Sequence, residues 1–254
     1  MRDLTYPLVV VAAQAATRAL RLRVDVTGAE HVPRRGGAVL ALNHISYVDF
    51  VYGGLAANPS RRLVRFMAKR ELFDHSLVGP LMRSLHHIEV DRGAGEASFR
   101  TAVDFLRQGE AVGIFPEATI SRSMELKEFK TGAVRIAGEA GVPIIPVIMW
   151  GTQRMMTKDH PKDFSRGKTI AITVGAPLHP TGKDPVAETA ELRTVMAGLL
   201  ERTIRDYPAV EQPPGSWWLP ASYGGSAPTP EEALRLDAEE RQRRAERKAN
   251  KSTK

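Results

Sequence analysis

Short apolar runs alternate with helix-like segments along most of the chain. Six runs of strand length, each bounded by polar or turn residues, predict buried β-strands. They are Val39–Leu42, Val64–Ala68, His87–Val90, Val112–Phe115, Ile144–Trp150 and Thr169–Val174. Runs that are apolar throughout, rather than alternating with polar residues, are typical of strands covered on both faces.

Between these runs, four segments have the apolar spacing of helices. They are Tyr47–Ala57, Leu77–Leu85, Glu96–Gln108 and Thr131–Ala140. Gly109 and Gly141 follow the last two segments directly, where a glycine commonly ends a helix. Strands separated by helices predict a single α/β domain whose largely parallel or mixed sheet is flanked by helices. The order of the strands does not follow from the pattern.

The chain begins with an apolar segment, Leu4–Thr17, which is followed by three arginines within residues 18–23. It is shorter than the ~20 apolar residues that cross a bilayer. Asp3 lies where a secretory signal would carry basic residues, so a signal peptide is also disfavoured. Two interpretations remain: an apolar helix in residues 1–24 that lies in a membrane surface, or a buried first helix of a soluble domain.

The composition changes near the C-terminus. Residues 213–230 contain five prolines and three glycines, which predicts an irregular linker around Trp217 and Trp218. We expect the two indole rings to pack back on the domain rather than to lie at a lipid interface. The tail beyond the linker is rich in Ala, Arg and Glu and is either a solvated helix or a disordered end. The predicted boundaries are 25–210 for the core domain and 211–254 for the linker and charged tail.

The composition excludes several classes of protein. Of the 254 residues, 43% are hydrophobic and 26% are charged, which excludes a disordered or fibrous chain. The lack of cysteine excludes a thiol nucleophile, a disulfide and a cysteine-bound zinc, and no other metal site is indicated. The net charge is +7, but residues 241–254 alone hold seven Lys or Arg and one Glu. The rest of the chain is therefore nearly neutral and, with 6% aromatic residues overall, gives little support to nucleic-acid binding.

A histidine and an aspartate follow the first predicted strand. His44 lies in the turn after Leu42, and Asp49 would lie in the first turn of the next helix. The carboxyl ends of strands in α/β proteins meet at the ligand crevice. On a continuous helix the two side chains would point ~140° apart, so we expect Ser46 to cap the helix and His44 to lie outside it.

This pair is a candidate for proton transfer. An imidazole can accept a proton from an alcohol, while a carboxylate behind it fixes the tautomer and stabilises the imidazolium. The alternative is structural, because the spacing of Ser46 and Asp49 also fits a capping box beside a turn histidine.

A second polar segment follows the strand that ends at Phe115. Glu117 and Thr119 are candidates to hold polar groups of a small substrate, or else they cap the next segment. Three cationic side chains follow in the sequence, and their N–H donors are suited to binding phosphate. They are Arg122, Lys127 and Lys130. The alternative is that they are only solvated surface charges.

Arg92 brings another cation to the same sheet edge, just after the strand that ends at Val90. The segment Gly93-x-Gly95-x-x-Ser98 that follows matches part of a dinucleotide-binding fingerprint, with Glu117 as the acidic residue for a ribose. The third glycine is missing, and the loop serves equally as a helix cap. A nucleotide-binding enzyme is therefore the competing class.

Together these residues resemble the 1-acylglycerol-3-phosphate acyltransferases, the family of glycerophospholipid acyltransferases with an NHxxxxD motif. The resemblance covers roughly Gly36–Ala176, with four motifs in the order that the family has them. They are Asn-His-x-Ser-x-x-Asp at 43–49, the region 68–73 with 90–92, Phe-Pro-Glu-Ala-Thr at 115–119, and 142–147.

The resemblance implies direct transfer of a fatty acyl group from acyl-CoA or an acyl carrier protein to a hydroxyl of a lysophosphatidate-type lipid, without a cofactor. His44 would be the general base and Asp49 its partner, with Asn43 and Ser46 beside them at the substrate. Arg92 would help to bind the acceptor phosphate. Glycerol 3-phosphate or another lysolipid is the alternative acceptor, and a non-catalytic lipid-binding protein of this fold is the alternative of another class.

Two positions depart from the family's pattern. Ala118 replaces a glycine, and Ile120 replaces an arginine associated with acceptor phosphate, so the three cations that follow would have to substitute for it. A lipid product implies an active site beside a bilayer, with the apolar N-terminal segment and the basic residues of 61–70 contacting lipid. We therefore expect a peripheral or monotopic protein at the cytoplasmic face of the cell membrane.

Overall fold

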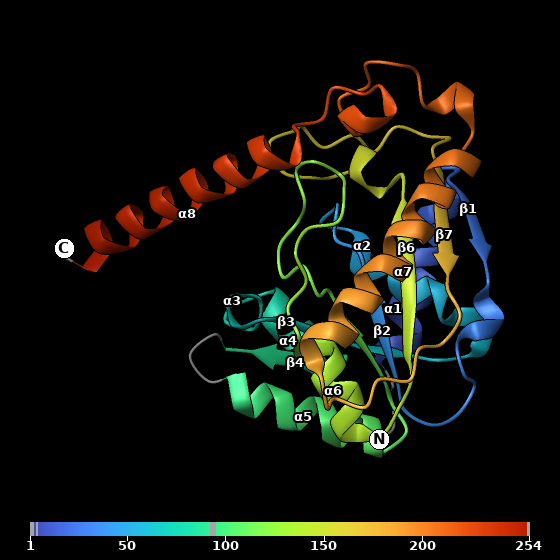
Figure 1. Cartoon of the computed structure of the whole chain (residues 1–254), viewed down its shortest axis with the longest axis vertical. Helices are drawn as coiled ribbons and strands as arrows, with labels where there is room; N and C mark the ends of the chain where they lie inside the picture. Colours follow the sequence, from blue (N-terminus) through green and yellow to red (C-terminus); the bar gives the residue numbers. More distant parts are fainter. Residues whose placement is uncertain (1–2, 4, 92–94, 253–254) are drawn as a thin grey trace.

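The central strands consist almost entirely of aliphatic residues, which explains why they lie in the middle of the molecule. All five residues of β2 (Ala38–Leu42) and all seven of β6 (Ile144–Trp150) are buried. The computed structural model describes residue 3, residues 5–91 and residues 95–252 (Figure 1). Because apolar side chains project from both faces of these strands, both faces need a cover of helices.

In the described part of the chain, seven strands form one mixed sheet in the order β1-β7-β6-β2-β5-β3-β4. The other strands are β1 (Arg23–Thr27), β3 (Val64–Lys69), β4 (Ile88–Val90), β5 (Ala111–Ile114) and β7 (Thr169–Val174). All pairings are parallel except that of β6 with β7. The predicted α/β sheet is confirmed, and the six predicted strands each begin and end within one residue of the expected positions. The pattern missed β1, whose residues alternate between half-buried and exposed at the sheet edge.

Helices lie on both sides of this sheet (Figure 1). They are α1 (Thr5–Ala19), α2 (Asp49–Ala56), α3 (Arg70–Phe73), α4 (Val78–Ser84), α5 (Gly95–Arg107), α6 (Gly132–Ala140), α7 (Pro185–Asp206) and α8 (Pro230–Ser252). The four predicted helices are confirmed as α2, α4, α5 and α6, and Gly109 and Gly141 have positive φ angles after the last two. Helix α7 was not predicted, although Leu192, Met196 and Leu199 recur at helical spacing and are buried.

Alternate residues of β2 point into two separate cores. Val39 and Ala41 pack with α5, α6 and α7, whereas Leu40 and Leu42 pack with α2 on the opposite face. The side-chain period of two along a strand produces this division. The two cores hold β2 in the middle of the sheet and so fix the position of the turn that follows it.

Helix α1 rests on the domain through few side chains. Tyr6 is its one buried residue and donates a hydrogen bond to the Val64 carbonyl at 2.7 Å, whereas Leu8 is 70% and Val11 61% exposed. The alternative of a buried first helix is therefore wrong, because most of the apolar surface of α1 remains uncovered. Within the described ranges, no helix has both the length and the apolar character needed to cross a bilayer.

The two tryptophans of the C-terminal linker pack back on the domain, as predicted. Trp218 is 7% exposed, and its ring centroid lies 6.0 Å from that of Trp150 and 6.1 Å from that of Tyr207. The final segment forms α8 rather than a disordered end, and ion pairs such as Arg235–Glu239, four residues apart, support it. Of the two alternatives for the charged tail, the structure has the solvated helix, so the irregular tail named in the fold prediction is limited to the linker before α8.

Candidate active site

The turn after β2 is built around one carboxylate. A single oxygen of Asp49 accepts hydrogen bonds from His44 Nδ1 at 3.0 Å, from the Ile45 amide at 2.8 Å and from the Ser46 amide at 2.7 Å. These bonds close the turn, and α2 begins only at Asp49. His44 therefore lies outside the helix, as its spacing from Asp49 predicts.

The second oxygen of Asp49 is also occupied. It accepts a hydrogen bond of 2.6 Å from the hydroxyl of Thr152, which follows β6 through Gly151 at φ 95°. Asp49 is fully buried, so four fixed donors replace the water that would solvate its charge. The carboxylate holds His44 in one orientation.

The His44 ring is partly open. With Nδ1–H donating to Asp49, Nε2 carries the lone pair that can accept a proton. The ring stacks on Phe115 at 4.3 Å between centroids, and 21% of the side chain remains exposed. An imidazole held in one tautomer beside an aromatic ring has the geometry that a general base needs.

Glu117 binds the loop after β5 to the same turn. One of its oxygens accepts from the His44 amide at 2.8 Å and the other from the Lys127 amide at 3.1 Å. Burial raises the pKa of Glu117 to about 8, against the two amide hydrogen bonds, which lower it. Both of its oxygens face backbone amides, so Glu117 orients the two loops. That it also holds a polar group of the substrate stays a prediction.

Asn43 and Ser46 are also structural in this arrangement. The Asn43 amide bonds to both backbone groups of Met149, at 3.0 and 2.7 Å, and the Ser46 hydroxyl donates to the Met156 carbonyl at 2.6 Å. Both residues are fully buried. Their polar atoms hold the turn against β6 and against the Met156 carbonyl, and their contact with substrate stays a prediction. Ser46 is also not the N-cap of α2, which is Val48.

The expected phosphate ligands have different environments. Arg122 is 5% exposed and, like Lys127, pairs with carboxylates of α8. The Thr119 hydroxyl accepts from Lys127 Nζ at 2.8 Å. Lys130 is exposed. Arg92 lies outside the described residues, as do the residues at 93 and 94 of the partial dinucleotide fingerprint.

A family model described as Acyltransferase matches residues 23–150, half of the chain. The chain belongs to the acyltransferase family. The matched segment contains the whole His44–Asp49 turn and Glu117. It ends before Thr152, Lys158 and the C-terminal helix.

Relatives and a solved structure agree with this membership of the family. The chain is 34% identical over 161 residues to the 1-acyl-sn-glycerol-3-phosphate acyltransferase of Bacillus subtilis (strain 168), covering 63% of this chain and 76% of that one. It is 32% identical over 168 residues to the alpha form of the same enzyme from Mus musculus, covering 65% and 58%. The crystal structure of the 1-acyl-sn-glycerophosphate (LPA) acyltransferase PlsC from Thermotoga maritima superposes with a TM-score of 0.67 at 25% identity, covering 82% of this chain and 86% of that one.

The sequence analysis did not identify Thr152, whose hydroxyl donates to Asp49, as a residue of the site. Its position just after the carboxyl end of β6 could have identified it. The same rule identified His44 after β2 and Glu117 after β5. The three strands are parallel neighbours, so the residues that follow them meet at one edge of the sheet.

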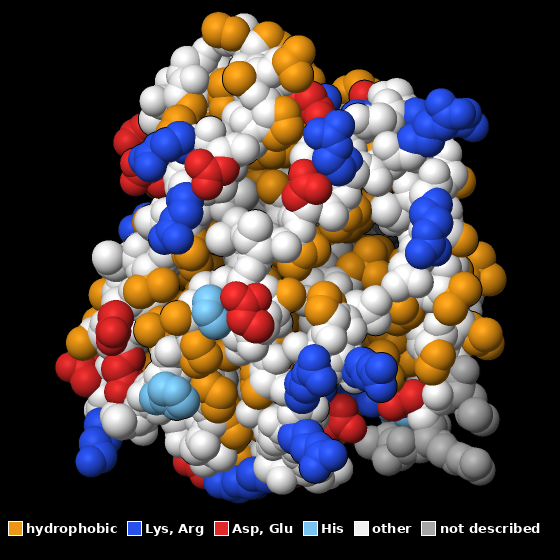
Figure 2. Space-filling model, turned by 90° about the vertical axis from the view of Figure 1, so that its right-hand side faces the viewer, with side chains coloured by type: hydrophobic (Ala, Val, Ile, Leu, Met, Phe, Trp, Pro, Cys, Tyr) orange, Lys and Arg blue, Asp and Glu red, His pale blue; other side chains and the backbone are white. Residues whose placement is uncertain are grey.

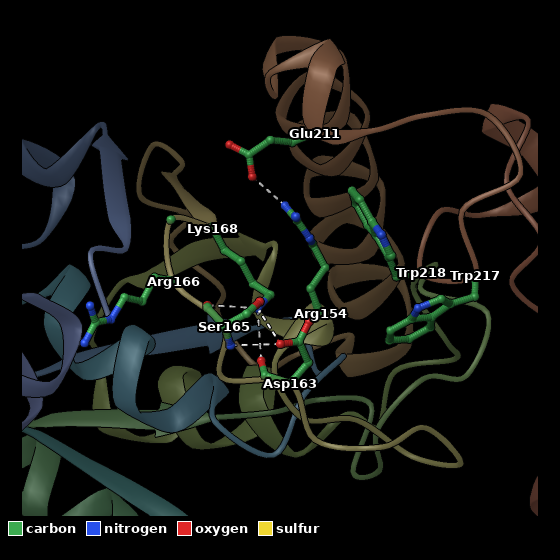
Figure 3. Close-up of a pocket in the computed structure, with 9 residues that line it drawn as sticks. Arg154, Asp163, Ser165, Arg166, Lys168, Glu211, Trp217 and Trp218 are labelled. Atoms are coloured by element: carbon green, nitrogen blue, oxygen red, sulfur yellow. Dashed lines mark hydrogen bonds and ion pairs between the residues drawn. The ribbon is translucent and has the colours of Figure 1, made fainter. Parts of the chain in front are cut away.

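A polar cavity of about 340 Å³ lies between the loop before β7 and the C-terminal linker (Figure 3). None of the predicted site residues lines it. Four of its charged groups form two ion pairs, since Arg154 lies 2.6 Å from Glu211 and Lys168 lies 3.0 Å from Asp163. We assign no part of the acyl-transfer chemistry to this cavity.

Proposed function

We propose that this acyltransferase-family protein transfers a fatty acyl group from an acyl thioester to the hydroxyl of a lysophosphatidate in phospholipid synthesis. The observation that carries the proposal is the 3.0 Å contact between His44 Nδ1 and Asp49 on a partly exposed imidazole. The names of the relatives supply the acceptor class. Glycerol 3-phosphate or another lysolipid is the alternative acceptor, and acyl-CoA or an acyl carrier protein is the donor.

The proposed chemistry needs only the chain's own side chains. His44 Nε2 accepts the proton of the acceptor hydroxyl as its oxygen attacks the thioester carbonyl. The new C–O bond forms, the C–S bond breaks, and the imidazolium returns the proton to the leaving thiolate. Asp49 stabilises the imidazolium meanwhile.

A covalent acyl-enzyme is disfavoured by the same geometry. The chain has no cysteine, and the hydroxyl of Ser46, the serine closest to His44 in the sequence, is buried and donates to a backbone carbonyl. A nucleophilic serine would need its hydroxyl directed at a base. Direct transfer between the two substrates therefore fits these residues better.

We further propose that the site works against the cytoplasmic surface of the membrane. Phe50 is 47% and Tyr47 44% exposed within six residues of His44 in the sequence, and Leu77, just before α4, is 81% exposed. Figure 2 shows hydrophobic side chains that reach the surface among Lys and Arg on one face of the molecule. Apolar side chains with cations around them suit an anionic lipid surface. Flotation with anionic liposomes tests this, and protein that remains in the soluble fraction at low salt would count against it.

The function is tested with purified protein, labelled acyl-CoA and a panel of acceptors: lysophosphatidate, glycerol 3-phosphate, a lysophospholipid with a larger headgroup, and monoacylglycerol. We expect acylation of lysophosphatidate above the others. Acyl carrier protein thioesters should be tested as donors in parallel. No transfer from either donor to any acceptor would reject the proposal.

A further inference from the structure

Three cationic side chains from two loops converge on α8. Arg122 and Lys127 follow β5, Lys158 follows β6, and all three contact Asp237. Glu240 lies 2.9 Å from Arg122 and 3.0 Å from Lys158. Arg122 is 5% and Lys158 11% exposed, so their charges are largely withdrawn from water. We call Arg122, Lys127 and Lys158 the cation cluster.

Helix α8 has little other attachment to the domain. Over residues 230–247, where its side chains are described, Ala233 and Asp237 are the buried ones. The helix projects away from the body in Figure 1. It follows the Pro- and Gly-rich linker, whose buried residues pack on the domain and end before α8 begins. The ion pairs with the cation cluster are therefore the main contacts that hold α8 in place.

The cation cluster borders the turn that carries His44. The Lys127 amide donates to the Glu117 carboxyl group that also accepts from the His44 amide. On the other side, the hydroxyl of Thr157, next to Lys158, donates to the Ile45 carbonyl at 2.7 Å. Both loops that supply the cations are thus bonded to the turn itself.

Two of the three positive charges of the cation cluster are balanced only by carboxylates of α8, and one doubly charged anion could balance them instead. Asp159 pairs with Arg122 and offsets one of the three positive charges. Asp237 and Glu240 offset the other two, and Glu240 also pairs with Arg244 of its own helix. A phosphate monoester carries about −1.5 to −2 at neutral pH and has three acceptor oxygens, so it matches the charge that the two α8 carboxylates supply.

We propose that the cation cluster is the binding site for the phosphate monoester of the acceptor, and that Asp237 and Glu240 of α8 occupy it when no acceptor is bound. Helix α8 is then an internal competitor that leaves when phosphate binds. The identity of the ligand as an acceptor lipid rests on the proposed function. The competition between phosphate and α8 rests on the contacts alone.

The first test follows α8 in the full-length protein by hydrogen exchange. We expect inorganic phosphate to raise the exchange of α8 amides more than sodium chloride of equal ionic strength does. Glycerol 3-phosphate and lysophosphatidate should act likewise, and monoacylglycerol, which has no phosphate, should not. Release by lysophosphatidate at lower concentration than by inorganic phosphate would identify a lipid headgroup as the preferred source of the anion.

The second test removes the internal competitor. For the double variant Asp237→Asn/Glu240→Gln we expect the KM for lysophosphatidate to fall about five- to tenfold, with kcat unchanged. The matched control is Glu239→Gln/Glu246→Gln, which removes two charges from α8 at residues that bond within the helix. The control should keep the KM of the parent.

The outcomes separate this inference from the proposed function. Release of α8 by phosphate in a protein that acylates nothing supports the anion site and rejects the acyltransferase. Normal acyl transfer, with the same KM in both double variants and no difference between phosphate and chloride, overturns the role of α8 and leaves the acyltransferase standing.

Discussion

Two buried aspartates of this protein have different kinds of partner. Asp49 is fully buried and accepts from an imidazole, two backbone amides and a hydroxyl, all held by the loops around it. Asp237 is also buried, but its partners are the three long cationic side chains of the cation cluster. Fixed donors around one carboxylate define a single geometry, whereas an ion pair can be exchanged for another anion. The comparison indicates a rigid turn at His44 and a replaceable cover at α8.

The largest effect is expected when the rigid turn is broken. Asp49→Asn replaces an acceptor oxygen by an NH₂ group that faces other donors. We expect the free energy of unfolding to fall by about 3 kcal/mol and acyl transfer by about a thousandfold. Urea denaturation and steady-state kinetics measure the two effects. Asp104→Asn, on an exposed position of α5, is the control and should change neither.

Removing one donor from the turn should have a smaller effect. Thr152→Val leaves one oxygen of Asp49 buried without its hydroxyl partner, so we expect a loss of about 1–3 kcal/mol of stability and of ten- to a hundredfold in kcat. Thr189→Val is the matched control, because the Thr189 hydroxyl is buried without a partner among the described residues. An equal loss in both variants would show that Asp49 does not depend on Thr152.

Glu117 should make the stability depend on pH. Its pKa is raised by burial from 4.5 to about 8, so between these values the folded state retains a proton that the unfolded state releases. The free energy of unfolding should therefore decrease as the pH rises through this range, by roughly 2 kcal/mol or more from this group. Urea denaturation across the range measures it. Glu117→Gln should flatten the dependence, and an unchanged slope would contradict the assignment.

The smallest effect is expected from salt, which should distinguish the surroundings of Asp49 from those of Asp237. Chloride competes with the two carboxylates of α8 for the cation cluster, so we expect α8 amides to exchange a few times faster while the amides of Ile45 and Ser46 stay protected. Hydrogen exchange measures both regions in one experiment. Equal responses would remove the distinction between a fixed turn and an exchangeable cover.

The sequence predicts the parts of the site that depend on local pattern. The apolar runs give six of the seven described strands, and the strand-end rule brings His44 and Glu117 to one edge. The five-residue spacing to Asp49 is enough to place His44 outside the helix. These features depend on neighbours within one turn or one strand.

The remaining features depend on contacts between distant segments. Thr152 reaches Asp49 across 103 positions, and Arg122 reaches Asp237 across 115. Asn43 was expected at the substrate from the family resemblance, and Glu117 because it follows the end of a strand. In the structure Asn43 satisfies backbone groups of β6 and Glu117 satisfies backbone amides of two loops, a requirement that only the assembled sheet creates.

The central claim is that His44 acts as the general base held by Asp49. It is tested most directly by the rate of acyl transfer from labelled acyl-CoA to lysophosphatidate in His44→Ala, with the circular dichroism spectrum and liposome binding measured on the same sample. We predict a fall of about a thousandfold in kcat with both structural measurements unchanged. A folded variant that retains substantial turnover would contradict the assignment.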